Sequence, residues 1–511
     1  MKHNFLFQGH LHNYSPFAIA RGLTLTMGIQ HSSIKMPIKQ LLGKLRQWLR
    51  LFRKPKYRWI WCLIAVGIYA VVIAISLPGF SFEAQRALAV FGVTAFLWGT
   101  NTLPLAVTGL VVLFLIPFSG ALPHDATYGY FGNRAVFFVL GAFILASPIM
   151  RSGLSTRLAL AVVTRFGYSQ KSLIASILSL AAAMSFVISS HAVAAMLFPV
   201  VLEVVRAAGA KPGGRFGTAA FLALAWGAGI GGIATLLGGA RAPLALGILL
   251  KTTGTSISFM QWIVWSLPLV LILLLFAYGL LLRIGRGTAV SLADAQKFLQ
   301  ARSQHLGPIS RRELGTAGVM VLTILLWVLK GEAWGLDTVA LLGVVLSFVL
   351  RIADWQEVEE DVNWGIFVMY GSAIALSAVL RDTGAAKALA ESLLASWISS
   401  PALSFVAVVA LVIFLTEGMS NAAAVAVLMP IALALATEYG VDPRAMTLGV
   451  TIPSGLAFML PVSTPAIAIV IGSGYVSPFQ AFQRGFILKL SGFFIFLAMA
   501  RFYWPLVGLG I

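Results

Sequence analysis

Charged residues are scarce in this sequence. Lys, Arg, Asp and Glu make up only 10% of the 511 residues, whereas 59% are hydrophobic and the mean hydropathy is +0.92. Soluble domains carry about 25% charged residues, so the composition excludes a water-soluble protein. A bilayer crossing takes about 20 residues, which leaves room for roughly ten to twelve spans and for no large extramembrane domain.

Acidic residues and cysteine are scarcer still. The 17 Asp and Glu face 36 Lys and Arg, and eleven of these cations lie in residues 1–58, a stretch without any acidic residue. Such an excess is found in nucleic-acid-binding proteins, but membrane proteins also collect Lys and Arg on cytoplasmic segments. The apolar composition favours the second interpretation, so we expect no nucleic-acid partner. The single cysteine, Cys62, cannot form an intramolecular disulfide.

Sequence motifs of catalysis are absent. No stretch matches GxxxxGK[ST], HExxH or GxSxG, and apart from His191 every histidine lies in the N-terminal tail or in a segment between apolar runs. The sequence therefore predicts neither a primary pump nor an enzyme, and no cofactor other than an ion. An intramembrane enzyme remains the remote alternative.

Residues 1–58 form a basic tail. Apolar residues recur at helical spacing between Lys and Arg over residues 34–53, which predicts an amphipathic helix lying on an anionic lipid surface. The first long apolar run starts at Trp59 and has no small-residue cleavage site, so we expect it to remain as the first span. These features predict an integral protein of the plasma (inner) membrane with a cytoplasmic N-terminus.

Uncharged runs divide the remaining chain into two transmembrane halves, 59–282 and 315–511. The polar segment 283–314 between them is interpreted as a cytoplasmic linker. The acidic residues at 354–361 are expected to form a loop on the same side as the linker. Lys and Arg gather on the segments that this topology places inside, as the positive-inside rule requires.

Four runs are too long or too interrupted for one simple crossing. Those at about 172–205 and 397–437 predict re-entrant hairpins, and those at about 216–250 and 445–473 predict broken helices. About eleven transmembrane helices remain once the hairpins return to their own side. The predicted fold is an all-α polytopic membrane protein with its C-terminus outside.

The two halves repeat a motif. Ser189-Ser190-His191 begins ten residues before a proline, and Ser420-Asn421-Ala422 begins ten residues before another. An odd number of crossings separates the two copies, which indicates an inverted repeat. After each copy comes a break rich in small residues and proline, GGARAP at 238–243 and PVSTP at 461–465. Backbone groups freed at such breaks must line a polar cavity, where helix N-termini suit an anion and carbonyls suit a small cation.

Four stretches in this order resemble the divalent anion/sodium symporter family, which carries dicarboxylates, citrate or sulfate. They are FVLGAFILASPIMRSGL, AGIGGIATLLGG, FLTEGMSNAAAVAVLMPI and LAFMLPVSTPAIAIVIGSG, and the resemblance extends from about Trp59 to Ile511. It implies hairpin tips that bind a substrate carboxylate, Na⁺ sites beside them, and an elevator movement of a transport domain within a homodimer.

The resemblance implies candidate residues position by position. Those for the anionic substrate are Ser189, Ser190, His191, Gly239, Arg241, Ser420, Asn421, Ala422, Thr464 and Pro465. Those for Na⁺ are Ser185, Ser189 and Gly238 in the first half, and Thr416, Asn421 and Ser463 in the second.

The chain departs from the family at several of these positions. Ser190 and His191 stand where the family has Asn and Thr, and Ala422 stands where it has Thr. Gly239, Ala240, Arg241 and Ala242 replace Thr-Pro-Pro-Asn in the first break, and Ala466 and Ile467 replace Pro-Asn in the second.

Arg241 gives these departures a joint meaning. An arginine at a midplane break is costly unless it faces a cavity and meets a partner, and a guanidinium fits a carboxylate or sulfate through two hydrogen bonds. Arg241 would then supply permanently the charge that Na⁺ supplies reversibly, and His191 would help to meet the anion. The alternative is that Arg241 pairs with Glu417 or a backbone carbonyl and stabilises the fold. Likewise, His191 is either a ligand or a satisfied interior histidine, and a structural role is favoured for Glu417 over proton carriage.

The short central linker leaves no room for the soluble inserts of some sulfate-carrying relatives, which favours a di- or tricarboxylate such as succinate, malate or citrate. The sequence thus predicts a secondary transporter of small divalent anions with weakened or lost sodium coupling. A sodium-independent anion exchanger and a channel-like permease are the alternatives, and sulfate stays open as substrate.

Overall fold

The computed structural model describes residues 58–510 except 76, 78, 288–295, 297–303, 395–399 and 462. The chain divides into the units Met1–Arg58 and Trp59–Ile511, and the helices described here belong to the second. The amphipathic helix predicted at residues 34–53 lies outside the described residues. Within these residues all regular structure is helical, as the composition predicted.

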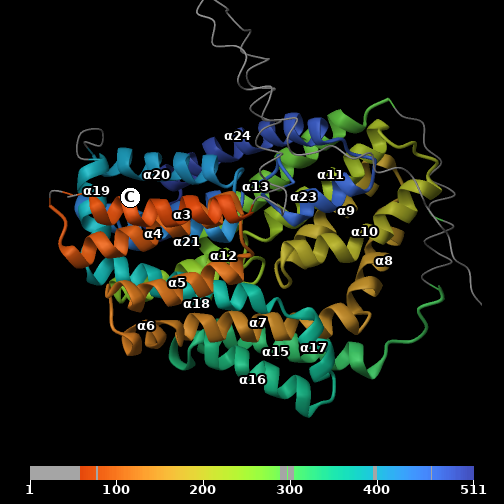
Figure 1. Ribbon diagram of the computed structural model, residues 1–511. Helices are drawn as coiled ribbons and strands as arrows, with labels where there is room; N and C mark the ends of the chain where they lie inside the picture. Colours follow the sequence, from red (N-terminus) through yellow and green to blue (C-terminus); the bar gives the residue numbers. More distant parts are fainter. Residues whose placement is uncertain are drawn as a thin grey trace, which may run out of the picture. The chain divides into compact units, whose positions relative to one another are not determined.

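The helices of the first half follow the uncharged runs of the sequence (Figure 1). They are α3 (Arg58–Ala74), α4 (Phe82–Thr100), α5 (Leu105–Ser119), α6 (His124–Phe131), α7 (Arg134–Arg151), α8 (Leu154–Phe166), α9 (Gln170–Ser185), α10 (Ser190–Ala207), α11 (Arg215–Gly231), α12 (Arg241–Thr253) and α13 (Phe259–Gly285).

The helices of the second half also follow uncharged runs of the sequence. They are α15 (Arg311–Trp334), α16 (Leu336–Val349), α17 (Trp355–Asp361), α18 (Trp364–Asp382), α19 (Ala385–Leu394), α20 (Pro401–Leu415), α21 (Asn421–Tyr439), α22 (Pro443–Ser454), α23 (Pro465–Gly472), α24 (Pro478–Phe502) and the 3₁₀ turn η2 (Trp504–Val507). One expectation was wrong, because the acidic segment at 354–361 is a helix, α17, rather than a loop. The Asp354 carboxylate caps it by accepting a hydrogen bond from the Gln356 N–H at 2.9 Å.

Helix ends are defined by local chemistry. Capping boxes start α9, α13, α15 and α24. In each of them the N-cap residue is Ser, and its partner at the third helical position is Ser, Gln or Glu. Glycines with a positive φ end α5, α12 and α21, at Gly120, Gly254 and Gly440. These signals lie at both ends of the apolar runs, so the sequence determines most boundaries to within a few residues.

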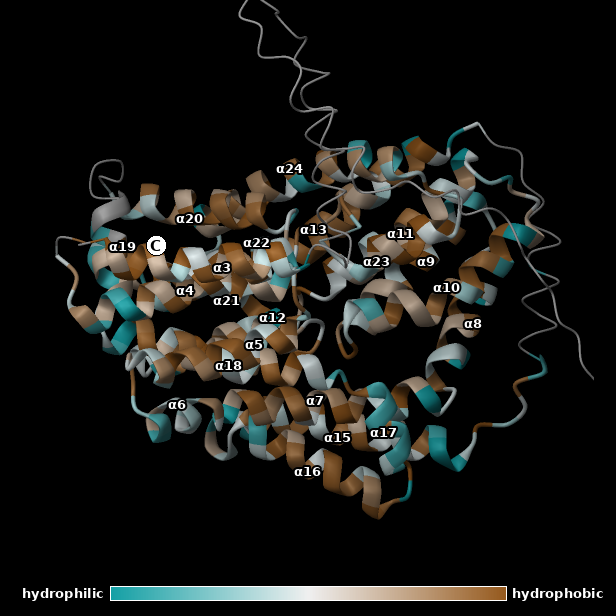
Figure 2. Cartoon of the chain, viewed as in Figure 1, coloured by the Kyte–Doolittle hydropathy of each residue, from teal (hydrophilic) through white to brown (hydrophobic). Residues whose placement is uncertain are grey.

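Seven of the described helices are long and apolar enough to cross a membrane. They include α13, in which only 28% of the most apolar 18-residue window is buried inside the protein. Large apolar side chains of α13, for example Leu271 and Leu275, are exposed. Figure 2 shows that hydrophobic residues predominate along the helices of this unit. Apolar surface of this extent needs lipid around it, so the chain is an integral membrane protein.

Four interruptions divide the remaining apolar runs into shorter helices. They lie at residues 186–189 between α9 and α10, at 232–240 between α11 and α12, at 416–420 between α20 and α21, and at 455–464 between α22 and α23. In Figure 1 α9 and α10 lie on the right and α20 and α21 on the left, on opposite sides of the unit.

Packing connects these elements. Helix α11 packs on α9, α10, α13 and α23, while α12 packs on α7, α18, α21 and α22. Helix α18 also packs on α5, and α15 and α16 pack on each other and on α7. As a result α12 places its first residue, Arg241, among elements from both halves of the chain.

Candidate functional site

The first interrupted region joins the tip between α9 and α10 to the break before α12. The backbone N–H of Ser190 donates to the carbonyl of Gly238 at 3.1 Å, and the hydroxyl of Thr235 donates to the carbonyl of Phe186 at 2.5 Å. A Cβ added to Gly238 would lie 2.4 Å from the carbonyl oxygen of Ser185 and from the Cα of Gly232. Only glycine allows this approach, so the tip and the break meet backbone to backbone.

Side chains of α13 donate hydrogen bonds to two backbone carbonyls of this break. The indole N–H of Trp262 donates to the carbonyl of Ile233 at 3.0 Å, and the hydroxyl of Ser266 donates to that of Ala234 at 3.1 Å. The hydroxyl of Ser185 is buried and has no hydrogen-bond partner. A polar atom left in this state next to freed carbonyls is available to a ligand.

Arg241 begins α12 and is 6% exposed. Its Nη2 donates to the carbonyl of Gly232 at 2.9 Å. Built on Gly455, a Cβ would lie 2.6 Å from Nη2, and built on Gly239 it would lie 2.6 Å from Nη1. Since Gly239 belongs to the first break and Gly455 to the second, the guanidinium lies where the two breaks face each other.

No acidic side chain of the described residues lies within salt-bridge distance of Arg241. The titratable side chains that lie close enough to interact electrostatically with Arg241 are His191 of the first tip and Tyr370 of α18. The phenol of Tyr370 is fully buried and its hydroxyl has no hydrogen-bond partner. The guanidinium is therefore a buried cation whose protein partner is a backbone carbonyl.

The second interrupted region also consists of a tip, between α20 and α21, and a break, between α22 and α23. Ser420 caps α21 by accepting from the N–H of Ala423 at 3.3 Å, and the Oδ1 of Asn421 is buried without a partner. The hydroxyl of Thr416 donates to the carbonyl of Ile413, and that of Ser463 donates to the carbonyl of Leu460 at 2.6 Å. Thr464 and Pro465 start α23, where the Thr464 side chain makes no capping bond.

An ion pair that the sequence reasoning missed joins this region to α24. The Nζ of Lys489 lies 2.7 Å from Oε1 of Glu417, and Oε2 of Glu417 accepts from the backbone N–H of Leu460 at 3.2 Å. Glu417 thus pairs with Lys489 and not with Arg241, so the expected pairing of Arg241 with Glu417 was wrong. The other expected partner of Arg241, a backbone carbonyl, is present at Gly232. The signal was a lysine in the middle of the last apolar run, a position where cations are rare.

The structure therefore brings the predicted residues together in two groups. Ser185, Ser190 and Gly238 meet in the first, next to His191, Gly239 and Arg241. Thr416 and Ser463 are joined in the second through Glu417 and Leu460. Ser189 and Ala422 flank the two tips and are partly exposed.

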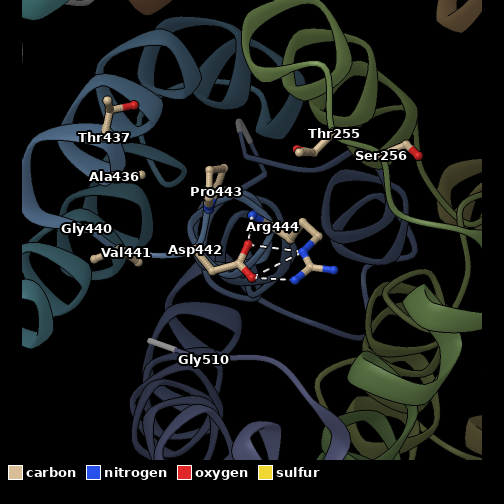
Figure 3. Close-up of a pocket in the computed structure, with 10 residues that line it drawn as sticks. All are labelled: Thr255, Ser256, Ala436, Thr437, Gly440, Val441, Asp442, Pro443, Arg444 and Gly510. Carbon is tan, nitrogen blue, oxygen red and sulfur yellow. Dashed lines mark hydrogen bonds and ion pairs between the residues drawn. The ribbon is translucent and has the colours of Figure 1, made fainter.

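A large cavity lies away from these groups. About 880 Å³ in volume, it is lined by the loops that follow α12 and α21 and by the start of α22 (Figure 3). Its charged residues are Asp442 and Arg444, whose side chains pair at 2.6 Å and neutralise each other. The cavity offers no net charge to an anion, so it is not the candidate binding site.

Comparisons with known proteins identify the family of this chain. A family model described as the sodium:sulfate symporter transmembrane region matches residues 56–509. The sodium-dependent dicarboxylate transporter SdcS of Staphylococcus saprophyticus is 28% identical over 441 residues, 81% of this chain and 85% of that protein. SdcS of Staphylococcus aureus is 28% identical over 457 residues, 84% of this chain and 88% of that protein.

Two solved structures share the fold. MtrF of Neisseria gonorrhoeae matches with a TM-score of 0.56 at 14% identity, over 80% of this chain and 96% of that one. The YdaH transporter of Alcanivorax borkumensis matches with a TM-score of 0.53 at 17% identity, over 83% and 98%. The family match covers nearly all of the transmembrane unit, so the chain belongs to the divalent anion/sodium symporter family and is a membrane transporter rather than an enzyme.

Proposed function

We propose that this protein is a secondary transporter of small divalent anions, that its substrate is a di- or tricarboxylate such as succinate, malate or citrate, and that its sodium coupling is weakened or lost. The observation that carries the proposal is the buried guanidinium of Arg241 between the two breaks. The relatives of this protein are named as dicarboxylate transporters, which supports the substrate class.

Arg241 needs an anion for energetic reasons. A buried cation without a counter-charge costs several kcal/mol, and one hydrogen bond to the Gly232 carbonyl offsets only part of this cost. The remaining N–H donors of the planar guanidinium match a carboxylate or a sulfate in a two-bond geometry. A divalent anion would satisfy Arg241 with one end and leave its other end for the hairpin tips.

The tips carry the groups that would hold that second end. His191 lies close enough to Arg241 to interact with it electrostatically, and the side-chain amide of Asn421, whose Oδ1 has no partner, would donate to the anion through its NH₂ group. The proposed binding set is Ser189, Ser190, His191, Gly239, Arg241, Ser420, Asn421, Ala422, Thr464 and Pro465.

The first candidate cation set offers Na⁺ the unpartnered hydroxyl of Ser185 and a crowded group of carbonyls, which suits a small cation. A bound Na⁺ there would join the tip to the break. The guanidinium of Arg241 contacts Gly239, the next residue after Gly238 of this set, so like-charge repulsion weakens binding of Na⁺. This is the reason for proposing weak coupling at a site whose oxygen ligands are present.

The proposed movement is of the elevator kind. The moving part would contain the two hairpins and the two broken helices with α13 and α24, and the fixed part would contain α3 to α7 and α15 to α18, through which two copies would form a homodimer. Helices α8 and α19 connect the parts in sequence. We place the N-terminus and the linker in the cytoplasm, because Lys and Arg gather on that side, and the C-terminus outside.

Reconstituted protein tests this function. Labelled succinate uptake into proteoliposomes would be followed with and without an inward sodium gradient, and with unlabelled succinate, citrate or sulfate trapped inside. We expect uptake to be driven by the trapped carboxylate and to change less than about twofold with sodium. Uptake that requires sodium would contradict weak coupling, preference for sulfate would contradict the substrate class, and flux that does not saturate would indicate a channel-like permease.

A further inference from the structure

Lys489 is buried in the middle of α24 at 5% exposure. Its ammonium lies 2.7 Å from the carboxylate of Glu417, which belongs to the interruption between α20 and α21. The other oxygen of that carboxylate accepts from the backbone N–H of Leu460, in the break between α22 and α23. One ammonium and one carboxylate thus hold together a transmembrane helix, the second hairpin tip and the second break.

These are the elements that the second candidate sodium set would join. Glu417 follows Thr416 directly, and the carbonyl of Leu460 accepts from the hydroxyl of Ser463 at 2.6 Å. A cation bound by Thr416, Asn421 and Ser463 would act as a bridge between the tip and the break. In this chain the bridge is already built from Lys489 and Glu417.

We propose that Lys489 is the resident cation of the second site, where its ammonium takes the place of Na⁺. An additional Na⁺ does not fit the charges there, since both oxygens of Glu417 are engaged and a second cation would face the largely desolvated ammonium of Lys489. The inference deepens the proposed function, on which its meaning for coupling rests, but it concerns a cation site that is testable without any substrate. Lys489 is a positioning residue, because it acts on the tip through Glu417.

Removal of the ammonium alone should create a sodium site. In Lys489→Ala the partly buried carboxylate of Glu417 remains beside Thr416 in the second tip, and the truncated side chain leaves room for an ion that Asn421 and Ser463 would also bind. A largely desolvated carboxylate without a partner recruits a cation. In the neutral pair Lys489→Met/Glu417→Gln no charge remains, so no site forms. Lys387→Ala, which breaks an exposed pair with Glu391 at 3.7 Å, serves as the surface control.

The measurement is thermal unfolding of purified full-length protein in Na⁺, K⁺ or choline at equal ionic strength and without substrate. For Lys489→Ala we expect Na⁺ to raise the Tm by about 2 °C or more over K⁺, beyond any difference in the wild type. The neutral pair and Lys387→Ala should show no difference beyond that of the wild type. Equal unfolding temperatures of Lys489→Ala in all three salts would overturn the proposal.

Folding of the variant is itself informative. If Lys489→Ala can be purified in Na⁺ and not in K⁺, while the neutral pair is purified in both, the proposal is supported; if it folds in neither salt while the neutral pair folds, the proposal is overturned. Lys489→Gln, which keeps a polar chain of similar length, replaces Lys489→Ala if both variants fail and is judged by the same salts. Failure of the wild type to take up any carboxylate would refute the proposed function and leave this salt comparison intact.

Discussion

Among the residues that the structure describes, each half of the molecule buries one cation beside an interrupted helix, and the two cations have different partners. Arg241 donates to the carbonyl of Gly232 and meets no carboxylate of the described residues, whereas Lys489 has the carboxylate of Glu417. A buried charge that lacks a protein counter-ion is available to a ligand, and one that has a counter-ion is neutral. The difference leaves the cation of the first half available to the anion, whereas the cation of the second half forms a built-in bridge.

The largest effect on substrate affinity is expected at Arg241. In Arg241→Ala the proposed partner of the anion is gone, so we expect the affinity for succinate to fall by about 100-fold or more, the loss typical of a buried charged pair that is broken. Lys489→Ala should lower that affinity less, by about 10-fold or less, since Lys489 does not contact the anion and acts on the second tip only through Glu417. Isothermal titration in detergent measures both, and equal losses in the two variants would remove the distinction between the halves.

Gly455 allows the guanidinium to be moved without being removed. The Cβ of Gly455→Ala would lie 2.6 Å from Nη2 of Arg241, and the flexible end of that side chain must shift. We expect about a 10-fold loss in succinate affinity with an unfolding temperature close to that of the wild type. Gly472→Ala is the matched control, because a Cβ there meets nothing within 4 Å. Unchanged affinity in Gly455→Ala would show that the position of the guanidinium does not matter.

His191 of the first tip tests whether a second side chain beside Arg241 holds the anion. If it donates to the anion beside Arg241, His191→Ala should reduce succinate affinity about 5-fold, and His191→Asn, which retains an N–H donor, should reduce it less. The same uptake and titration measurements apply. A larger loss in His191→Asn than in His191→Ala would favour a packing role for this residue.

The smallest effect is expected at a peripheral ion pair. Asp361 of α17 accepts from Arg151 at 2.7 Å and from Ser147 at 2.7 Å. Burial raises the pKa of the Asp361 carboxyl, but these hydrogen bonds outweigh it and hold that pKa below its usual value. Its stabilisation is therefore complete above about pH 4 and is lost as the pH falls through the lowered pKa.

The coupling free energy of the Arg151–Asp361 pair can be compared with that of the Lys489–Glu417 pair. A double-mutant cycle on Arg151→Ala and Asp361→Asn should give a coupling of about 1 kcal/mol or less, with transport unchanged. The same cycle on Lys489→Met and Glu417→Gln should give about 2 kcal/mol or more, because the pair is desolvated. Chemical denaturation provides the free energies, and a larger coupling at Asp361 would contradict this order.

Much of the fold was visible in the sequence. The all-helical, polytopic architecture followed from apolar runs of helical length, and the four family stretches identified the family that the comparisons confirm. The helix α17 was missed because Trp355–Asp361 carries four acidic residues among seven, a composition typical of a loop; its capping by Asp354 and the pairing of Asp361 and Glu360 with Arg151 stabilise the helix.

The sequence by itself determined where helices run, where they are interrupted and that Arg241 stands at one of the interruptions, because hydrophobic periodicity, caps and small residues act locally. Only the tertiary structure decided which charge meets which partner. Glu417 and Lys489 are 72 residues apart, and Arg241 lies against Gly455 from the other half of the chain. Such pairings depend on how α12, α22 and α24 pack, and no local pattern encodes that arrangement.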